Sequence, residues 1–289
     1  MKCYIYHSGG TPYVLDLIDE LKKYVDICTF PSECDMIISI QMGGYNELLQ
    51  LHRAYPHIPF ITYVWDCYEW IWEYDRNYDW RAYGEIVKIS KQIWVPSSGQ
   101  QLRVNQHWGV DLSKTRVIKA YARLFDFNNT IDNGYVCNPL REIPDRHLGW
   151  IEKACDQLSI PYIHGGRKRG SIGKSWDEYK EFIAQSSFIV CPWYEASTGG
   201  MSLIEGYNLG KEILICNSPY MGAKDYFGDR ANYFDPTYES LVESIKKMWD
   251  NRYKKSKYSL SDKKIFCKEN HSIEIMAYNL YKAMIDVCN

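Results

Sequence analysis

Short apolar runs alternate with amphipathic stretches along the first half of the chain. Apolar runs typical of buried strands lie at 3–6, 25–30, 36–40, 60–64 and 92–95. Stretches with the apolar spacing of helices lie between them, at 13–24, 47–55 and 81–90. Strands buried on both faces are continuously apolar, and helices join neighbouring parallel strands. The pattern therefore predicts a parallel sheet with helices on both of its faces.

The same alternation starts again after a polar loop at 127–133. Strands are expected at 134–137, 161–164, 188–191 and 213–216, and helices at 147–158, 176–185, 202–209 and 241–251. A basic linker, KKSKYSLSDKK, then precedes a last helix at 272–287. We therefore predict an α/β protein with two Rossmann-like, doubly wound domains, 1–130 and 131–270, followed by a C-terminal helix within 271–289.

Length and charge agree with this organisation. A chain of 289 residues suits two domains of ordinary size, and an apolar content of 46% supports two substantial cores. The net charge of -2 gives no global attraction to nucleic acid or to an anionic membrane.

The cysteines and the N-terminus indicate an intracellular location. The ten cysteines include no C-x-x-C pair and no histidine cluster at zinc spacing, so we expect buried, reduced thiols and no metal site. The first residues, MKCYIYHSGG, have no apolar core of a signal peptide, and no apolar run approaches the ~20 residues that span a bilayer. We therefore expect a cytoplasmic protein without a transmembrane segment.

The strongest candidate for chemistry is the segment 187–219. An apolar run at 188–193 leads into a loop of small residues, then a helical pattern, then a second apolar run at 212–216. Gly199 and Gly200 allow the backbone to pass close to a ligand, and the N–H groups that open the following helix suit an anion. Glu205 falls in about the first turn of that helix, where a carboxylate would bind hydroxyl groups beside a phosphate. The segment therefore predicts a nucleotide-sugar site.

This segment also resembles the signature of the retaining glycosyltransferases of the family 4 type (glycosyl transferases group 1). The matching residues are Pro192, Glu195, Gly200-Met201-Ser202, Glu205 and Gly210. The family usually places seven residues between its two acids, whereas nine lie between Glu195 and Glu205. The resemblance is specific over the C-terminal half and weak over the N-terminal half.

The resemblance implies the GT-B fold, in which two Rossmann-like domains face a central cleft and the C-terminal helix crosses back to the first domain. The first domain would then lie on the acceptor side, and the second would bind the nucleotide sugar. It also implies a hexosyl- or pentosyltransferase that retains the anomeric configuration. No cofactor or metal is obligatory in the family, and the donor expected here is a nucleoside-diphosphate sugar, above all a UDP-sugar.

Residue roles can be carried over position by position. Glu205 would bind the ribose hydroxyls and Glu195 the donor sugar, while the amides of Gly200 to Leu203, including those of Met201 and Ser202, would hold the diphosphate. Arg141 and Arg146 match the basic pair that neutralises the leaving phosphates. Their alternative role is that of two surface arginines in a proline-bounded loop.

The N-terminal half offers fewer matches. Gly9 and Gly10 follow the first strand and would let the donor approach the backbone, although a plain tight turn explains them as well. Asp66 aligns with an acid near the reacting sugar, and Trp65 stands where many relatives have histidine. Catalytic roles are thus assigned to Glu195, Asp66, Arg141 and Arg146.

The acceptor is left open by the sequence. Nine aromatic residues crowd 63–83, and among them Trp65 and Tyr68 would stack on a sugar ring or a base, or pack in the core. Arg167 and Lys168 lie in a basic loop that would contact a phosphate or be solvated. A glycan, lipid or protein hydroxyl fits, and so does a hydroxymethylated base of DNA modified by a compact phage or viral enzyme in its host's cytoplasm. A non-catalytic nucleotide-sugar-binding protein or scaffold with the GT-B fold is the alternative.

Overall fold

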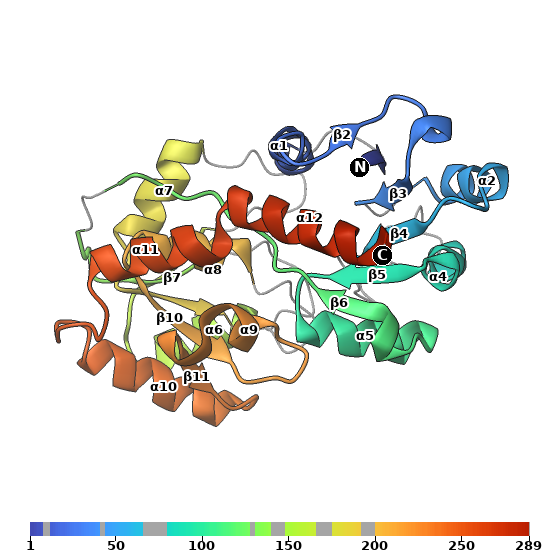
Figure 1. The fold of residues 1–289 in the computed structure, drawn as a ribbon. Coiled ribbons are helices and arrows are strands. Elements are labelled where there is room, and N and C mark those ends of the chain that lie inside the picture. The colour runs from blue at the N-terminus through green and yellow to red at the C-terminus, as the bar shows by residue number, and fades with distance from the viewer. Residues whose placement is uncertain are drawn as a thin grey trace. The chain divides into compact units, whose positions relative to one another are not determined.

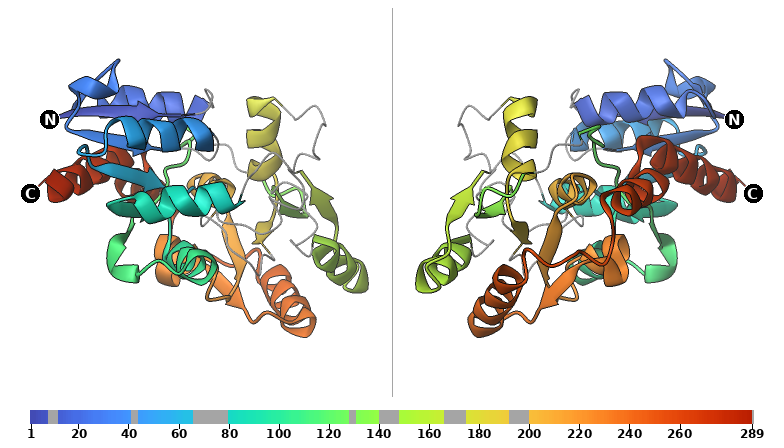
Figure 2. Two further views of the ribbon diagram at one scale, coloured as in Figure 1. Left: turned by 90° about the vertical axis from the view of Figure 1, so that its right-hand side faces the viewer. Right: turned by 90° about the vertical axis from the view of Figure 1, so that its left-hand side faces the viewer.

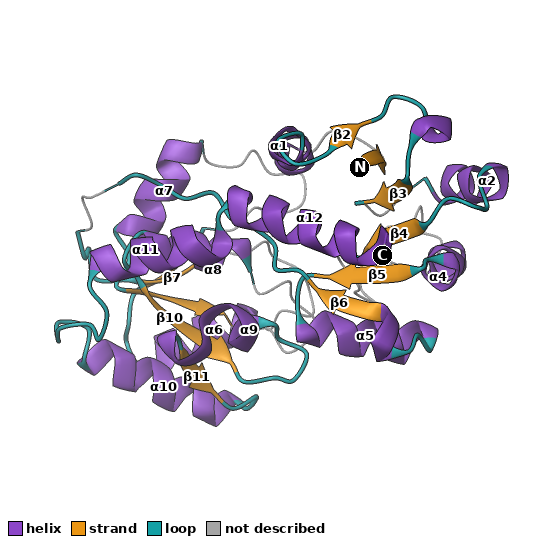
Figure 3. Cartoon of the chain, in the orientation of Figure 1, coloured by secondary structure: helices purple, strands orange, loops and turns teal. Residues whose placement is uncertain are grey.

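The computed structural model describes residues 1–7, 12–40, 44–65, 80–127, 131–139, 148–165, 175–191 and 200–288. It divides into two compact units. Unit 1 comprises Met1–Tyr121 together with Ile273–Asn289, and unit 2 comprises Ala122–Ser272. In both units, helices alternate with strands along the chain (Figure 3).

Unit 1 contains a six-stranded sheet with the order β2-β1-β3-β4-β5-β6, in which every neighbouring pair is parallel. The strands are β1 (Lys2–Tyr6), β2 (Asp26–Ile27), β3 (Met36–Ser39), β4 (Phe60–Tyr63), β5 (Gln92–Val95) and β6 (Thr115–Val117). Its helices are α1 (Pro12–Leu21), α2 (Tyr45–Ala54), α4 (Trp80–Ile89), α5 (Ser98–Trp108) and α12 (Ile273–Cys288) (Figure 1).

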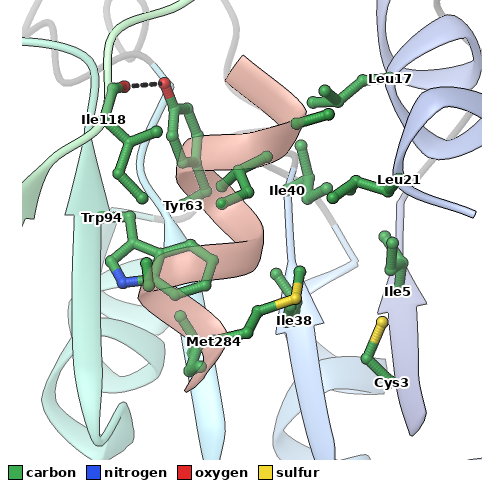
Figure 4. Packing of buried hydrophobic residues seen from close by; sticks show 14 of the residues in the cluster. Cys3, Ile5, Leu17, Leu21, Ile38, Ile40, Tyr63, Trp94, Ile118 and Met284 are labelled. Atoms are coloured by element: carbon green, nitrogen blue, oxygen red, sulfur yellow. Dashed lines mark hydrogen bonds between the residues drawn. The ribbon is translucent and has the colours of Figure 1, made fainter. Parts of the chain in front are cut away.

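Side chains of alternate strand residues pack on opposite faces of this sheet, as the pleat requires. Ile61 and Tyr63 belong to the core that α1 and α12 cover, whereas Phe60 packs in the core beneath α2 and α4. The Tyr63 hydroxyl, which is buried in the first of these cores, donates to the Ile118 carbonyl oxygen at 2.7 Å (Figure 4). Both faces of the sheet are thus buried, which accounts for the continuously apolar strands.

The last helix, α12, is an integral part of unit 1. Its buried residues recur at helical spacing and face the β1–β6 sheet; they are Met276, Ala277, Leu280, Ala283, Met284 and Val287. At its end, the Lys91 ammonium group donates to the Val287 carbonyl oxygen at 2.7 Å, and Arg116 pairs with Asp286. The predicted return of the C-terminal helix to the first domain is therefore confirmed.

Unit 2 contains a five-stranded parallel sheet with the order β11-β10-β9-β7-β8. The strands are β7 (Val136–Asn138), β8 (Tyr162–His164), β9 (Phe188–Cys191), β10 (Glu212–Cys216) and β11 (Asn232–Phe234). The helices are α6 (Leu148–Gln157), α7 (Trp176–Ala184), α8 (Met201–Asn208), α9 (Ala223–Phe227), α10 (Tyr238–Asp250) and α11 (Leu260–His271).

Two cores cover the two faces of the unit 2 sheet. Helices α7, α8, α9 and α11 contribute to the core that contains Ile189 and Ile213, and α6 and α10 to the core that contains Val190 and Leu214. Helices α6 and α10 lie side by side (Figure 2). The fold class predicted from the sequence, two Rossmann-like domains with doubly wound parallel sheets, is confirmed. None of the helices in the described ranges has both the length and the apolar character of a membrane span.

The structure also differs from the predicted elements. Residues 254–264 were expected as a linker, but α11 begins within them at Leu260 because Ser259 and Asp262 form a capping box. The expected strand at 25–30 is reduced to Asp26–Ile27, and α5, β6, α9 and β11 had not been predicted.

Candidate functional site

The candidate site lies where α8 begins. Since all strands of the unit 2 sheet are parallel, their carboxyl ends lie at one edge, and α8 starts at that edge after β9. Strand β9 pairs with β7, whose other neighbour is β8, so the strand order reverses between β7 and β9. Ligands of doubly wound sheets bind at this kind of switch point. The start of α8 therefore lies at the position in unit 2 that the topology favours for a ligand.

Gly200 shapes the first turn of α8. Its φ of 77° lies in the left-handed region, and a Cβ atom there would lie 3.0 Å from Leu203 Cγ. The Gly200 carbonyl oxygen accepts from the N–H groups of Leu203 at 2.9 Å and Ile204 at 3.3 Å. The N–H groups of Met201 and Ser202 precede these and have no acceptor within the helix. The first turn thus presents two amides of partly exposed residues at the positive end of a helix.

Glu205 is the fifth residue of α8, at the beginning of its second turn. Its side chain is buried, with the residue only 3% exposed. The hydroxyl group of Tyr179 donates to Glu205 Oε2 at 2.8 Å. A buried carboxylate needs such donors, because its desolvation is otherwise costly. Tyr179 on α7 is therefore part of the immediate surroundings of Glu205.

Helix α7 is fixed at its start by a capping box. The Ser175 hydroxyl accepts from the Glu178 N–H at 3.2 Å, and the Glu178 carboxylate accepts from the Ser175 N–H at 2.7 Å. The Trp176 ring stands edge-on to the Tyr179 ring, with centroids 5.8 Å apart. The Arg123 guanidinium also lies over the Trp176 ring, 4.6 Å from its centroid. Tyr179 is thus held on a capped helix and against a braced aromatic ring.

The segment at 122–127 also binds α8 directly. The N–H of Phe125 donates to Asn208 Oδ1 at 2.7 Å, at the end of the helix that carries Glu205. The Phe125 ring lies 6.3 Å from the Trp176 ring. This segment therefore links α7 and α8 from outside the sheet.

Gly206 sets the distance between α8 and the sheet. A Cβ atom at this position would lie 2.0 Å from Ile189 Cδ1 on β9. The absence of a side chain lets the helix approach β9 at the point where Glu205 is positioned.

Two buried lysines fix the end of α8 and the turn into β10. The Lys263 ammonium group donates to the carbonyl oxygens of Gly210 at 2.9 Å and Lys211 at 3.3 Å, and pairs with Glu212 at 2.6 Å. Burial lowers the pKa of Lys263, and the nearby Glu212 opposes this shift. The Lys211 ammonium group donates to the Ser186 carbonyl oxygen at 2.7 Å, and burial lowers its pKa to about 8. A cation at a helix C-terminus is favourable to the helix dipole, so Lys263 stabilises α8 from its far end.

The structure places some of the predicted site residues and not others. Gly200, Met201, Ser202, Leu203 and Glu205 lie together at the start of α8. Trp65 follows β4 in unit 1, where it is partly buried and its ring lies 5.3 Å from that of Tyr63. The other predicted residues lie outside the described ranges; they are Gly9, Gly10, Asp66, Tyr68, Arg141, Arg146, Arg167, Lys168, Glu195 and Gly199. Their roles stay predictions.

Three residues around Glu205 were not singled out from the sequence. Tyr179 and Asn208 are polar residues within predicted helices, and nothing in their spacing relates them to Glu205 or Phe125. Gly206 carried a usable signal, because a glycine inside a helix often marks close packing. Among the described residues, no group of three or more His, Cys, Asp or Glu side chains could hold a metal ion.

Comparisons with known proteins relate the chain to others through its structure. No protein-family model and no curated protein matches the sequence. A glycosyltransferase from Rickettsia africae has a TM-score of 0.67 at 12% identity, with 99% of this chain and 98% of that chain covered. HepE from Anabaena in complex with UDP has a TM-score of 0.66 at 13% identity, with 99% of each chain covered. Sucrose-phosphate synthase from Thermosynechococcus elongatus has a TM-score of 0.64 at 12% identity, with 99% of this chain and 98% of that chain covered. Over its whole described length, the chain therefore has the GT-B fold of glycosyltransferases.

Proposed function

We propose that this protein is a glycosyltransferase that moves a sugar from a UDP-sugar to a hydroxyl acceptor. The observation that carries the proposal is the start of α8, where Gly200, the first helical amides and Glu205 meet at the switch point of unit 2. Such an arrangement suits a diphosphate next to a ribose. The fold supports the nucleotide, because the structurally similar HepE was solved with UDP and with UDP-glucose.

The donor would bind through hydrogen-bond donors, which contact its diphosphate, and through carboxylates, which contact its ribose and sugar. The amides of Met201 and Ser202 would donate to the diphosphate, with Arg141 and Arg146 neutralising its charge. The Leu203 N–H already donates to Gly200, so its contribution would be indirect. Glu205 would accept hydrogen bonds from the ribose hydroxyls, and Glu195 would bind the sugar. Gly9 and Gly10 would let the donor approach the backbone.

Transfer would proceed with retention. The leaving phosphate would take the proton of the acceptor hydroxyl on the same face of the sugar, while the new glycosidic bond forms and the bond to the diphosphate breaks. Stabilising the negative charge on that phosphate would then supply much of the rate. Asp66 would lie near the reacting sugar.

The acceptor would be a hydroxyl group of a glycan, a lipid or a protein, or of a hydroxymethylated DNA base. Trp65 and Tyr68 would stack on it, and Arg167 and Lys168 would contact a phosphate. A DNA mobility assay at rising salt separates these classes, since binding to DNA phosphates weakens as salt increases.

The proposal is tested by replacing Glu205. We expect Glu205→Gln to lower UDP affinity by roughly tenfold or more and to abolish transfer from UDP-glucose, because a neutral amide accepts ribose hydroxyls more weakly than a carboxylate. UDP affinity is measured by calorimetry, and transfer by UDP release with a panel of acceptors. Glu181→Gln, an exposed residue of α7, serves as the matched control. Unchanged UDP binding and turnover in Glu205→Gln would reject the site.

A non-catalytic nucleotide-sugar-binding protein is the second candidate. Two observations favour it: nine residues separate Glu195 and Glu205, and Trp65, at the position where many relatives have histidine, packs on Tyr63. Release of UDP from UDP-glucose, by transfer or by hydrolysis, would exclude this candidate, whereas UDP binding without any turnover would support it.

A further inference from the structure

We propose that Tyr179 is a positioning residue that orients Glu205 for ribose and thereby makes the site selective for ribonucleotides over 2′-deoxyribonucleotides. This inference rests on the proposed function, because it concerns how the same site recognises a nucleotide. The observation behind it is the 2.8 Å hydrogen bond from the Tyr179 hydroxyl to Glu205 Oε2.

The bond restricts a side chain that would otherwise have several rotamers. Glutamate has three rotatable side-chain bonds, and its terminal torsion is broad. Glu205 is 3% exposed, so the enclosed carboxylate is oriented by its neighbours rather than by water. A hydrogen bond to an ionised acceptor is stronger than one between neutral groups. Tyr179 therefore anchors one oxygen of the carboxylate and so restricts its orientation.

Tyr179 itself is held firmly enough to do this. It lies on the first turn of α7, directly after the capping box formed by Ser175 and Glu178. The Trp176 ring packs edge-on against its ring, and Arg123 covers Trp176. A hydroxyl on a braced ring is a better orienting group than one on a flexible chain, because less side-chain entropy is lost on forming the bond.

An oriented carboxylate recognises ribose by its two adjacent hydroxyls. A carboxylate offers about four acceptor positions, so it binds a pair of hydroxyls while it keeps the bond from Tyr179. A 2′-deoxyribose lacks one of these hydroxyls and leaves a buried acceptor position unsatisfied. A site built to bind a hydroxyl rejects the analogue without it. Selectivity against the deoxynucleotide therefore depends on the orientation that Tyr179 imposes.

The test compares the affinities of UDP and 2′-deoxy-UDP in Tyr179→Phe, which removes only the hydroxyl. In the unmodified protein, we expect UDP to bind about tenfold more tightly than 2′-deoxy-UDP. In Tyr179→Phe, we expect UDP affinity to fall by about tenfold and 2′-deoxy-UDP affinity by less than about threefold, so that the ratio approaches one. Tyr238→Phe is the matched control, because its hydroxyl bonds to Gln157 at 3.0 Å on the opposite face of the unit 2 sheet; its ratio should not change.

A double-mutant cycle shows whether Tyr179 acts through Glu205. The effect of Tyr179→Phe on UDP affinity should disappear in the Glu205→Gln background, since the hydroxyl then has no carboxylate to orient. Calorimetric unfolding establishes that each variant is folded. If Tyr179→Phe is not folded, Trp176→Ala takes its place, because the ring that it removes is half exposed. This variant should partly lower the ratio of UDP affinity to 2′-deoxy-UDP affinity.

The outcomes separate this inference from the proposed function. Absence of UDP binding in the unmodified protein would reject the nucleotide site altogether. UDP binding with the same ratio in Tyr179→Phe, or an equal effect of that variant with and without Glu205, would overturn the role of Tyr179 and leave the proposed function standing.

Discussion

The close approach of α8 to the unit 2 sheet depends on Gly206. We predict that Gly206→Ala destabilises the protein, and that the same substitution becomes stabilising once Ile189 is shortened to valine. In Gly206→Ala, the new Cβ atom would lie 2.0 Å from Ile189 Cδ1, with Ile183 Cγ2 at 3.5 Å beside it. Ile189 is fully buried on a strand paired on both sides, so its side chain has little room to move. The Ile189 side chain, the helix that carries Glu205 or the surrounding core must then shift.

The expected magnitude follows from two opposing terms. Overpacking a core in this way costs about 1–3 kcal/mol, whereas replacing glycine by alanine inside a helix gains about 1 kcal/mol. Gly206→Ala should therefore lower the free energy of unfolding by about 0–2 kcal/mol. Ile189→Val deletes the clashing Cδ1 atom and by itself costs about 0.5–1.5 kcal/mol. In that background Gly206→Ala should be stabilising by up to about 1 kcal/mol, which amounts to a coupling energy of about 1–3 kcal/mol.

Equilibrium urea unfolding of the four proteins measures the coupling, and hydrogen exchange of the α8 amides shows whether the loss is local. Gly149→Ala is the control, because nothing lies within 4 Å of a Cβ atom built there. Its stability should be unchanged or slightly higher. An equal stabilisation by Gly206→Ala in both backgrounds would refute the reasoning, since it would mean that α8 does not lie against Ile189.

Two further predictions concern the parts that support α8. The pKa of Lys211 is lowered by burial from 10.5 to about 8, so the unfolded state binds more protons between these values and stability rises with pH there. From pH 7 to pH 9, urea unfolding should show a gain of about 1 kcal/mol that Lys211→Met lacks, and equal pH profiles would contradict it. Ser259→Ala removes the hydroxyl that accepts from the Asp262 N–H at 3.1 Å, and should cost about 1 kcal/mol. Faster hydrogen exchange in the first turn of α11 would report this loss, and Ser261→Ala in the same turn, the control, should not cause it.

The layout of both sheets could be predicted from local pattern. The strand at 188–191 and the helix at 176–185 agree with β9 and α7 to within a residue. Each segment is long enough for the spacing of its apolar residues to distinguish a strand from a helix. The short edge strands differ from the prediction: β2 is only Asp26–Ile27, and β11 is not among the predicted strands. Edge strands are half covered, so they carry weaker apolar runs than central ones.

The start of helix α11 has a local signal in the sequence. Its capping box, Ser259 with Asp262, is visible in the sequence as a serine followed three residues later by an acid. The basic composition of 254–264 suggested a linker instead. The burial of Lys263 explains the difference. Its ammonium group donates to carbonyl oxygens just after the end of α8, so this charged side chain is buried inside the unit and not exposed to solvent.

The sequence by itself determined the elements of the site: the glycine before α8, the helix that follows, and a glutamate at a fixed place on it. These depend on residues within one or two helical turns of one another, so periodicity and backbone preference are sufficient. Only the tertiary structure decided what surrounds Glu205. Tyr179 lies 26 residues before it, and Phe125 lies 83 residues before Asn208, its partner on the same helix. Such pairs form only after the sheet has brought α7, α8 and the segment at 122–127 together, and no local pattern encodes that proximity.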